Sequence, residues 1–390
     1  MKKYVQRDIL PYLKKMLQGF PTVSLCGPRQ SGKTTLCRTE FPHLEYVNLE
    51  NPGLRQLALQ DPVGFIAQFD KGAIFDEIQL VPELFSSLQV VIDDDRFNNN
   101  KSRKFILTGS SNFSLMPQLR QSLAGRTAIL TLLPFSLHEL KAAYMSASTD
   151  EYIFNGGYPL VWDSDSDMRT EILENYINTY VERDVRRLME IKDLNKFHIF
   201  LKLCAARIGT ELNKSSLSIE LGVSVSTIDN WISVLETSYV IFLLKPWFSN
   251  IGKRLTKTPK VYFYDTGLAC TLLNITSIRD FYLNPLRGQL FENLVISNYQ
   301  KKVYNFGIKE ELFFFRDKTG NEVDLLIDTN EGIKAYEIKS GATFQPEYMK
   351  NIKYLKKLLG EKIYESGIIY TGEMELPKKE ESIINFTNFK

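Results

Sequence analysis

Short apolar runs and stretches of helical periodicity alternate over residues 1–147 of the chain. The runs lie at 22–26 ("TVSLC"), 73–75 ("AIF"), 105–107 ("FIL") and 127–133 ("TAILTLL"). Each run is short enough for a strand, and the segments between them can form helices. Alternating strands and helices predict an α/β unit with a parallel sheet and flanking helices.

Helical periodicity dominates the next part of the chain. Apolar residues such as Ile172 and Tyr176 are spaced for one buried face within residues 168–189, which predicts a helix in a small helical lid. The segment 148–167 before it carries a Gly-Gly-Tyr-Pro turn and an acidic, serine-rich run. These turn and loop residues mark a boundary between structural units.

Residues 195–247 have the pattern of a winged helix: a helix that ends at Leu221, a turn at Gly222, a second helix from near Ser224, and an apolar strand as the wing. Such units often read DNA through the N-terminal residues of the second helix. Here the second helix contains acidic residues but neither Lys nor Arg. The pattern therefore gives little support to base-specific reading.

The last part of the chain combines one long helix with strands. An amphipathic stretch, "RGQLFENLVISNYQ", predicts a helix that begins at 287. "ELFFFRDKTGNEVDLLID" predicts a hairpin turned at 318–320, and "IKAYEIKSG" predicts a further strand. Since 390 residues exceed one ordinary core, we expect units at 1–147, 148–193, 194–256 and 257–390.

Composition narrows the class of protein but not its activity. The chain has 44% hydrophobic and 24% charged residues, and it lacks an uninterrupted apolar stretch of membrane-spanning length. We expect a cytoplasmic protein without membrane contact. The four cysteines are far apart, so neither a zinc site nor a disulfide framework is indicated. A net charge of +2 means that nucleic-acid affinity would require a local basic face.

The most specific motif is "GPRQSGKT" at 27–34, which follows the first apolar strand and fits the Walker A spacing. Glycines let backbone N–H groups wrap phosphate oxygens, Lys33 can reach the outer phosphates, and Thr34 can ligate Mg²⁺. The predicted nucleotide-binding residues are Gly27, Pro28, Arg29, Gln30, Ser31, Gly32, Lys33, Thr34 and Thr35. The sequence therefore predicts ATP and Mg²⁺ as cofactors.

Two later strands add candidates for the same site. "GAIFDEIQ" supplies Asp76 to hold magnesium and Glu77 to polarise the attacking water. "KFILTGSSN" ends in Thr108, two serines and Asn112, one of which could sense the outer phosphate. We take Asn112 as the first choice among these four.

Arg126 lies directly before the strand 127–133, at the end of a predicted helix. This arrangement resembles the AAA+ ATPases, in which an arginine at that place reaches the nucleotide of a neighbouring subunit. The resemblance implies that Arg126 is an arginine finger and that the active protein is a homo-oligomer. A surface arginine that caps its helix is the competing interpretation.

Several phrases together resemble one group of bacterial and archaeal AAA+ ATPases, in which the core is followed by a conserved domain of unknown function with a nuclease-like fold. The phrases are "GPRQSGKTTL", "FDEIQ", "ILTGSSN", "LAGR", "NGGYP", "ERDV", "KVYFYDTGL" and "GNEVDLLI…EIKSG". The resemblance implies a multidomain α/β protein with a P-loop AAA+ core, a helical lid, a winged helix-turn-helix and a C-terminal domain.

The C-terminal domain carries acids and a lysine that resemble the site of PD-(D/E)XK nucleases. Residues two apart on a strand face the same side, so Glu337 and Lys339 point together, and antiparallel pairing could bring Asp324 beside them. The resemblance implies that Asp324, Glu337 and the helix-borne Glu292 hold metal and that Lys339 helps to activate water.

Three interpretations of this domain stay open. It is a Mg²⁺-dependent nuclease gated by ATP, a nucleic-acid or protein-binding module without catalysis, or part of an ATP-dependent switch with protein partners only. A stretch of lysines after the wing, at Lys245, Lys253, Arg254, Lys257 and Lys260, could contact a phosphate backbone without sequence preference. A solvated basic surface is the alternative for that stretch.

Overall fold

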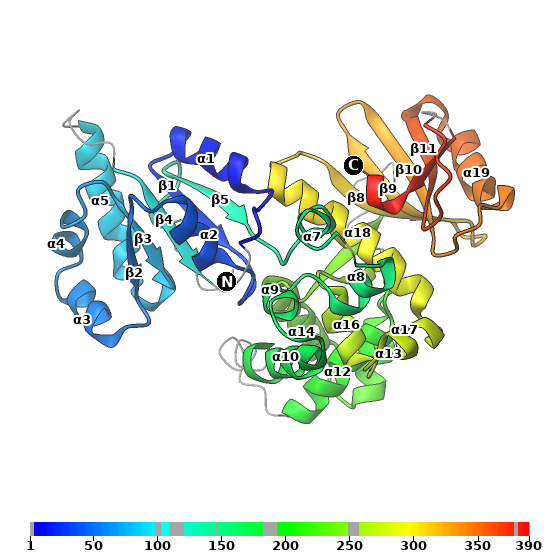
Figure 1. Cartoon of the computed structure of the whole chain (residues 1–390), viewed down its shortest axis with the longest axis horizontal. Coiled ribbons are helices and arrows are strands. Elements are labelled where there is room, and N and C mark those ends of the chain that lie inside the picture. Colours follow the sequence, from blue (N-terminus) through cyan, green and yellow to red (C-terminus); the bar gives the residue numbers. More distant parts are fainter. Residues whose placement is uncertain are drawn as a thin grey trace.

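The computed structural model of the chain describes residues 4–97, 103–109, 121–145, 147–181, 193–248, 257–377 and 381–389, without the side chains of residues 180 and 181. Figure 1 shows an α/β part at the left, a group of helices below the centre and a second sheet at the upper right. The N-terminal α/β part and the second sheet are joined through the helices. This arrangement agrees with the expected multidomain α/β architecture.

The N-terminal sheet is parallel, as the sequence predicts, with the strand order β2-β3-β4-β1-β5. Helices α1 (Leu10–Gly19) and α2 (Lys33–Glu40) pack on one face, and α3 (Pro52–Gln60), α4 (Pro62–Ala67) and α5 (Glu83–Phe97) cover the other. The strands are β1 (Thr22–Cys26), β2 (Glu45–Asn48), β3 (Ala73–Asp76), β4 (Phe105–Gly109) and β5 (Thr127–Thr131).

Helices follow the N-terminal sheet. They begin with α7 (Leu137–Ala143), α8 (Thr149–Asn155), α9 (Pro159–Trp162) and α10 (Arg169–Tyr176). The segment expected as a boundary is largely helical, and Tyr152, Ile153 and Phe154 belong to the largest hydrophobic core. The long helix expected at 168–189 begins as α10 and continues as a π-helix over Ile177–Val181, and its remainder lies outside the described residues.

The helix-turn-helix pattern corresponds to α12 (Leu194–Ala206), α13 (Lys214–Leu221) and α14 (Val225–Thr237). Gly222 ends α13 in the left-handed region at φ 59°, and the Ser224 side chain accepts a hydrogen bond from the amide of Thr227 at the start of α14. The two helix boundaries therefore lie where the turn chemistry predicts them. A winged-helix function stays a prediction.

The C-terminal sheet has seven strands in the order β12-β11-β10-β9-β8-β6-β7. Its strands are β6 (Ile241–Pro246), β7 (Lys260–Phe263), β8 (Glu311–Arg316), β9 (Glu322–Thr329), β10 (Gly332–Lys339), β11 (Ile363–Tyr370) and β12 (Ser382–Asn385). The expected hairpin is β8–β9, and β9 pairs antiparallel with β10. The expected wing strand, β6, also pairs in parallel with β8, so the wing and the C-terminal strands form one sheet.

Helices pack on both faces of this sheet. α16 (Thr266–Leu272) and α17 (Ile278–Leu283) precede α18 (Arg287–Phe306), which begins where the sequence predicts, and α19 (Lys350–Leu359) packs on the far face. The four cysteines are free and buried. None of the described helices is both long enough and apolar enough to cross a membrane.

Candidate functional site

The Walker A residues form a loop between β1 and α2, at the carboxyl edge of the N-terminal sheet. Three of its residues have positive φ: Gly27 at 148°, Gln30 at 58° and Gly32 at 93°. Such alternation turns successive backbone N–H groups toward one concave side, which is a nest for anions. Gly27 must lack a side chain, since a Cβ there would lie 2.1 Å from the carbonyl oxygen of Leu132. Lys33, Thr34 and Thr35 occupy the first turn of α2.

Lys33 is buried inside this loop, with 6% of its surface exposed. Its Nζ donates to the carbonyl oxygens of Gly27 at 2.9 Å and Pro28 at 2.7 Å. Burial lowers the pKa of Lys33, and the charges of Glu77 and Asp76 act in the opposite direction. The ammonium is thus close to both predicted Walker B acids.

Asp76 ends β3 and receives three hydroxyl donors. Thr34 Oγ1 lies 2.9 Å from Asp76 Oδ2, Tyr46 donates to the same oxygen at 2.6 Å, and Thr108 donates to Oδ1. Thr108 reaches it because β4 lies between β1 and β3. The predicted magnesium ligands Thr34 and Asp76 are therefore in contact.

Glu77 follows directly in the left-handed region, at φ 56° and ψ 43°. A non-glycine residue there costs about 1–3 kcal/mol, and such conformations concentrate at functional sites. The carboxylate of Glu77 accepts a hydrogen bond from the side-chain amide of Gln79. This backbone conformation places Glu77 at the start of a short 3-10 helix, Ile78–Leu80, beside the loop.

The two remaining nucleotide-site candidates have different outcomes. Asn112, the first choice as a phosphate sensor, lies outside the described residues. Arg126 comes before β5 and forms a two-pronged ion pair with Asp93 of α5, at 2.8 and 2.7 Å. Its carbonyl accepts a bond from Thr22 at the amino end of β1, so Arg126 lies at the sheet edge opposite the Walker A loop. This placement agrees with a role toward another subunit, which stays a prediction.

The residues present fit a nucleotide with magnesium. The loop amides form an anion nest, Ser31 has a buried hydroxyl without a hydrogen-bond partner among the described residues, and Lys33 is held among them. Thr34 and Asp76 offer a hydroxyl and a carboxylate, which are hard oxygen ligands suited to Mg²⁺. A site of this kind completes its magnesium shell with phosphate oxygens and water.

The C-terminal site brings together three of its four predicted residues. Lys339 Nζ lies 2.7 Å from Glu337 Oε2 and 3.4 Å from Asp324 Oδ2, and Asp324 also accepts the amide of Ile338 at 2.8 Å. Asn351 of α19 donates to the other oxygen of Glu337 at 3.1 Å. The expected convergence of Asp324, Glu337 and Lys339 on one face is present.

Burial and charge act differently on these groups. Burial and the neighbouring Asp324 charge raise the pKa of Glu337 to about 8. Burial alone would raise the pKa of Asp324 too, but the charges of Lys339 and Lys260 and the hydrogen bonds with Glu337 and the Ile338 amide together outweigh it, so the pKa is lowered. Burial would lower the pKa of Lys339, and the two carboxylates reverse this and raise it. The site thus keeps a charged lysine beside an ionised Asp324.

Glu292 is engaged elsewhere. It accepts a hydrogen bond from Tyr262, and Lys260 Nζ lies 3.5 Å from its Oε1 and 2.5 Å from Glu322 Oε1. Burial and the charge of Asp324 raise the pKa of Glu292 to about 7, against the effects of Lys260 and Tyr262. Asp324 is near enough for its charge to act on Glu292, but the groups that contact the Glu292 carboxylate are Lys260 and Tyr262.

Lys260 corrects one expectation. The sequence places it with exposed lysines that could contact a phosphate backbone, but it is 2% exposed and points into the acidic group beside β9. It lies on β7, the end strand of the sheet, which α12, α16 and α18 contact and whose four residues are all buried. Lys245 and Lys257 are exposed, while Lys253 and Arg254 lie outside the described residues.

The three acids expected to hold a metal ion in the C-terminal domain contact two different lysines. Within the described parts of the chain, no group of three or more His, Cys, Asp or Glu side chains is placed to hold a metal ion. Asp324 and Glu337 share Lys339, while Glu292 faces Lys260. A metal ion held by all three acids therefore stays a prediction.

Three residues at these sites escaped the sequence analysis: Arg7, Tyr46 and Lys260 in its buried role. Arg7 precedes α1 and donates to the carbonyl oxygen of Ser31, inside the Walker A loop, at 2.7 Å. An isolated arginine or tyrosine carries no motif, so only the fold brings these side chains to the sites. Strand position gave no signal for Tyr46 either, since it is the second of the four β2 residues and pairs in register with Ile74, two residues before Asp76.

Comparison with family models divides the chain into three segments. Residues 19–141 match a model described as an AAA domain, 146–279 match a domain of unknown function (DUF8612), and 287–389 match a domain of unknown function (DUF4143). The first match supports an AAA+ ATPase core with ATP binding and hydrolysis. The other two carry no described activity.

Related sequences extend over most of the chain. A protein of Mycobacterium tuberculosis described as uncharacterized is 28% identical over 95% of this chain and 81% of its own length. An uncharacterized protein of Haemophilus influenzae is 25% identical over 78% of this chain and 82% of its own length.

Solved structures with similar folds are more distant. A Walker-type ATPase of Pyrococcus abyssi is 14% identical, covers 68% of this chain and 94% of its own, and has a TM-score of 0.46. The Orc1 protein of Aeropyrum pernix in complex with DNA is 14% identical, covers 71% of this chain and 93% of its own, and has a TM-score of 0.28.

Proposed function

We propose that this protein is a Mg²⁺-dependent ATPase of the AAA+ type, which couples nucleotide hydrolysis to action on nucleic acid through its C-terminal half. The observation that carries the ATPase part is the contact of Thr34 with Asp76 beside the buried Lys33. Lys33 and Thr34 lie where the loop joins α2, and Asp76 ends a different strand. Phosphoryl transfer requires groups such as these around the phosphates and the magnesium ion.

The roles of the residues follow from their chemistry. The amides of the Walker A loop and Lys33 bind the outer phosphates, and Lys33 exchanges its two carbonyl partners for phosphate oxygens. Thr34 and Asp76 would hold Mg²⁺, which neutralises charge on the phosphates. Glu77 orients and polarises the attacking water. Tyr46 and Thr108 fix the direction of the Asp76 carboxylate.

The ATPase assignment is tested with Lys33→Ala and Glu77→Gln. Loss of the lysine should abolish nucleotide binding, measured with a fluorescent ATP analogue. Glu77→Gln should bind the analogue normally but release phosphate at least about a hundredfold more slowly, because only activation of the water is lost. Hydrolysis at the wild-type rate by Lys33→Ala would overturn the assignment.

The nucleic-acid part rests on the C-terminal arrangement of Asp324, Glu337 and Lys339 on neighbouring strands. The Lys339 side chain is 32% exposed, so its ammonium can approach a phosphodiester from solvent and orient water near it. The exposed Lys245 and Lys257 add local positive charge on the same part of the chain. Binding through such groups should weaken with salt and show little sequence preference.

Incubation with linear and circular DNA and with RNA, with and without Mg²⁺ and ATP, tests this part. Asp324→Asn and Lys339→Met should lose any cleavage while retaining the fold. Cleavage that persists in both variants would remove the proposed site. Arg126→Ala, analysed by light scattering with a non-hydrolysable ATP analogue, tests the proposed homo-oligomer.

A second candidate is an ATP-dependent switch whose C-terminal domain binds a protein without catalysis. The engagement of Glu292 by Lys260 and Tyr262 favours it, because these contacts hold the expected third metal ligand in a neutralised group. Under this proposal no nucleic acid binds or is cut, while ATP hydrolysis still requires Lys33 and Glu77.

A further inference from the structure

Arg7 makes contacts that join separate parts of the chain. The side chain is 4% exposed, and each of its three nitrogens has an acceptor. Nη1 donates to the carbonyl oxygen of Ser31 at 2.7 Å, Nη2 to that of Leu133 at 2.7 Å, and Nε to Glu139 Oε1 at 2.9 Å. The guanidinium also lies over the ring of Phe135, 4.8 Å from its centre.

Glu139, the acidic partner of Arg7, is itself held in place by further hydrogen bonds. It is 1% exposed and accepts, besides Arg7, the amides of Asp8 and Ser136, both at 2.7 Å. A buried ion pair gains little stability over apolar residues of similar size even when its remaining hydrogen-bonding groups are satisfied. We therefore expect the Arg7–Glu139 pair to fix the orientation of the groups that it contacts rather than to add stability.

The contact with Ser31 has a direct consequence for phosphate binding. In a planar trans peptide the carbonyl oxygen and the following N–H point in opposite directions. By holding the Ser31 oxygen, Arg7 fixes the direction of the Gly32 N–H on the other side of that peptide plane. Gly32 is the residue before Lys33 and has φ 93°, so its amide belongs to the anion nest.

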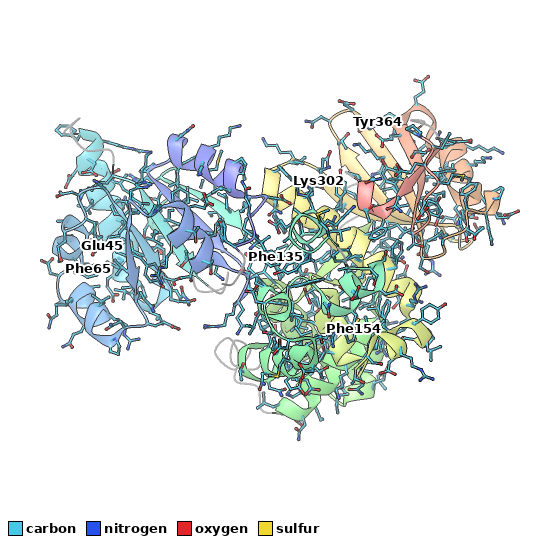
Figure 2. All side chains as sticks on the ribbon, in the orientation of Figure 1. Glu45, Phe65, Phe135, Phe154, Lys302 and Tyr364 are labelled. Carbon is cyan, nitrogen blue, oxygen red and sulfur yellow. The ribbon has the colours of Figure 1, made fainter. Side chains whose placement is uncertain are left out.

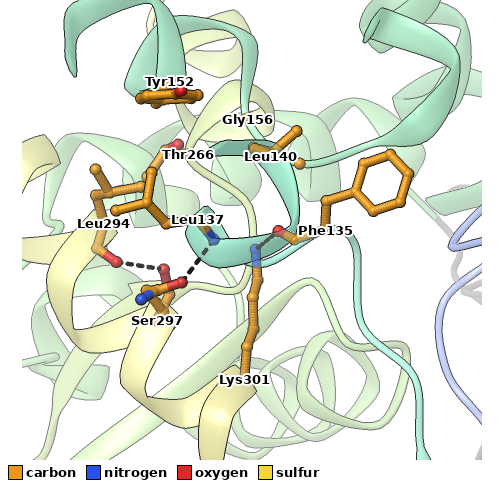
Figure 3. A pocket seen from close by; sticks show the side chains of 11 residues that line it. Phe135, Leu137, Leu140, Tyr152, Gly156, Thr266, Leu294, Ser297 and Lys301 are labelled. Atoms are coloured by element: carbon orange, nitrogen blue, oxygen red, sulfur yellow. Dashed lines mark hydrogen bonds between the residues drawn. The ribbon is translucent and has the colours of Figure 1, made fainter. Parts of the chain in front are cut away.

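The segment 132–139, which Arg7 contacts at Leu133 and Glu139, also forms hydrogen bonds with α18. Lys301 donates to the carbonyl oxygen of Phe135 at 2.9 Å, and the amide of Leu137 donates to Asn298 Oδ1 at 2.8 Å. Figure 3 shows the Lys301 side chain rising from α18 to Phe135. Figure 2 places Phe135 where the N-terminal α/β part meets the rest of the chain. Six residues before Asn298, the same helix carries Glu292.

We propose that Arg7 is a positioning residue of the nucleotide site, which aligns the Ser31–Gly32 peptide against the segment bound to α18. The proposal rests on the proposed ATP site. Without Arg7 the loop still contains Lys33, but the orientation of the Ser31–Gly32 peptide is no longer fixed. The same loss should loosen the contact between the loop and the segment 132–139.

Hydrogen exchange of the full chain without added nucleotide tests the proposal, with wild type, Arg7→Met and Arg7→Lys. The matched control is Arg103→Met, since Arg103 is also buried and pairs with an acid, Asp95, at 2.8 and 2.8 Å, in the same part of the chain, but does not contact the Walker A loop. We expect amides in 27–36 and 132–139 to exchange at least about tenfold faster in Arg7→Met, and to stay within about threefold of wild type in Arg103→Met.

Nucleotide binding provides the second readout. Arg7→Met should bind a fluorescent ATP analogue about tenfold more weakly, with a larger effect on KM than on kcat. Arg7→Lys restores the charge beside Glu139 but cannot reach three acceptors at once, so it should recover only part of the affinity. If Arg7→Met does not fold, the exchange and affinity of Arg7→Lys decide the matter.

Exchange of 27–36 at the wild-type rate in the Arg7 variants would overturn the proposal, as would equal acceleration in Arg103→Met. Failure of the wild type to bind the analogue is a different result: it removes the proposed ATPase function. The exchange measurement needs no nucleotide and still decides whether Arg7 positions the loop.

Discussion

Replacement of Lys260 by Met is the most informative single change in the C-terminal sheet. The ammonium is 3% exposed and serves two carboxylates, Glu322 at 2.5 Å and Glu292 at 3.5 Å. Met preserves most of the side-chain volume and fits beside the ring of Phe314, over which the ammonium lies at 5.1 Å. The change therefore removes charge and hydrogen bonds with little change in packing.

Removal of one partner from a buried ion pair costs about 3–5 kcal/mol, because the other charge stays buried without compensation. The lower end applies here, since Glu322 is 27% exposed and water can solvate it. In a chain of 390 residues, a loss of about 3 kcal/mol should lower the melting temperature by about 4 °C. Lys353→Met is the matched control: its partner Glu381 is 3.8 Å away and both are more than half exposed, so less than about 0.5 kcal/mol should be lost.

The pH dependence gives the sign of the effect. Burial already holds the pKa of Glu292 above its ordinary 4.5, at about 7, and such an acid costs stability as pH rises from 4.5 through that value. Without Lys260 its pKa should rise further, so the cost should grow. The difference in melting temperature between wild type and Lys260→Met should thus be larger at pH 8 than at pH 5.

The assay is thermal unfolding followed by circular dichroism at both pH values, extended to the double variant Lys260→Met/Glu292→Gln. The second substitution removes a charge that the first leaves uncompensated, so the double variant should be more stable than Lys260→Met alone. A shift below about 2 °C in Lys260→Met, or strictly additive effects, would refute the assignment of Lys260 as the internal counter-charge.

Other predictions concern the nucleotide site. Tyr46→Phe should keep the fold and the nucleotide affinity, but Asp76 loses a donor at 2.6 Å. Hydrolysis should therefore require an Mg²⁺ concentration about threefold to tenfold higher, measured by titration of Mg²⁺. Gly27→Ala should abolish nucleotide binding in the fluorescence assay, since its Cβ would lie 2.1 Å from a backbone oxygen, whereas Gly19→Ala, with nothing within 4 Å of its Cβ, should not. Arg126→Ala should reduce hydrolysis only at protein concentrations that allow assembly, and an equal loss at every concentration would contradict a role between subunits.

The nucleotide site could be predicted from sequence because most of its parts are contiguous. A strand, a glycine loop, a lysine and a helix follow one another within sixteen residues, "TVSLCGPRQSGKTTLC", and this order itself defines the geometry. Asp76 followed because parallel strands bring their carboxyl ends to one edge. Arg7 could not be found this way, since its partners lie 24 to 132 positions away.

The C-terminal site was predicted correctly in its strand geometry and incompletely in its charges. The spacing of Glu337 and Lys339 on one strand fixes their common face, and the adjacent antiparallel strand supplies Asp324. Lys260 could not be separated from its exposed neighbours, because a lysine after a loop has the same local pattern whether its strand is covered or not. Burial is a property of the assembled sheet.

The shared sheet of β6 and β8 limits how the protein can be divided. Proteins are often trimmed, fused or recombined at inferred domain boundaries, and the sequence alone predicts one such boundary at 256/257. A cut there would separate β6 from β7 and remove the β8 edge with which β6 pairs through Lys245 and Pro246. Both fragments would expose backbone donors and acceptors and invite aggregation. A swap of this C-terminal domain between relatives would succeed only with a donor whose own edge strand accepts β6 in the same parallel register.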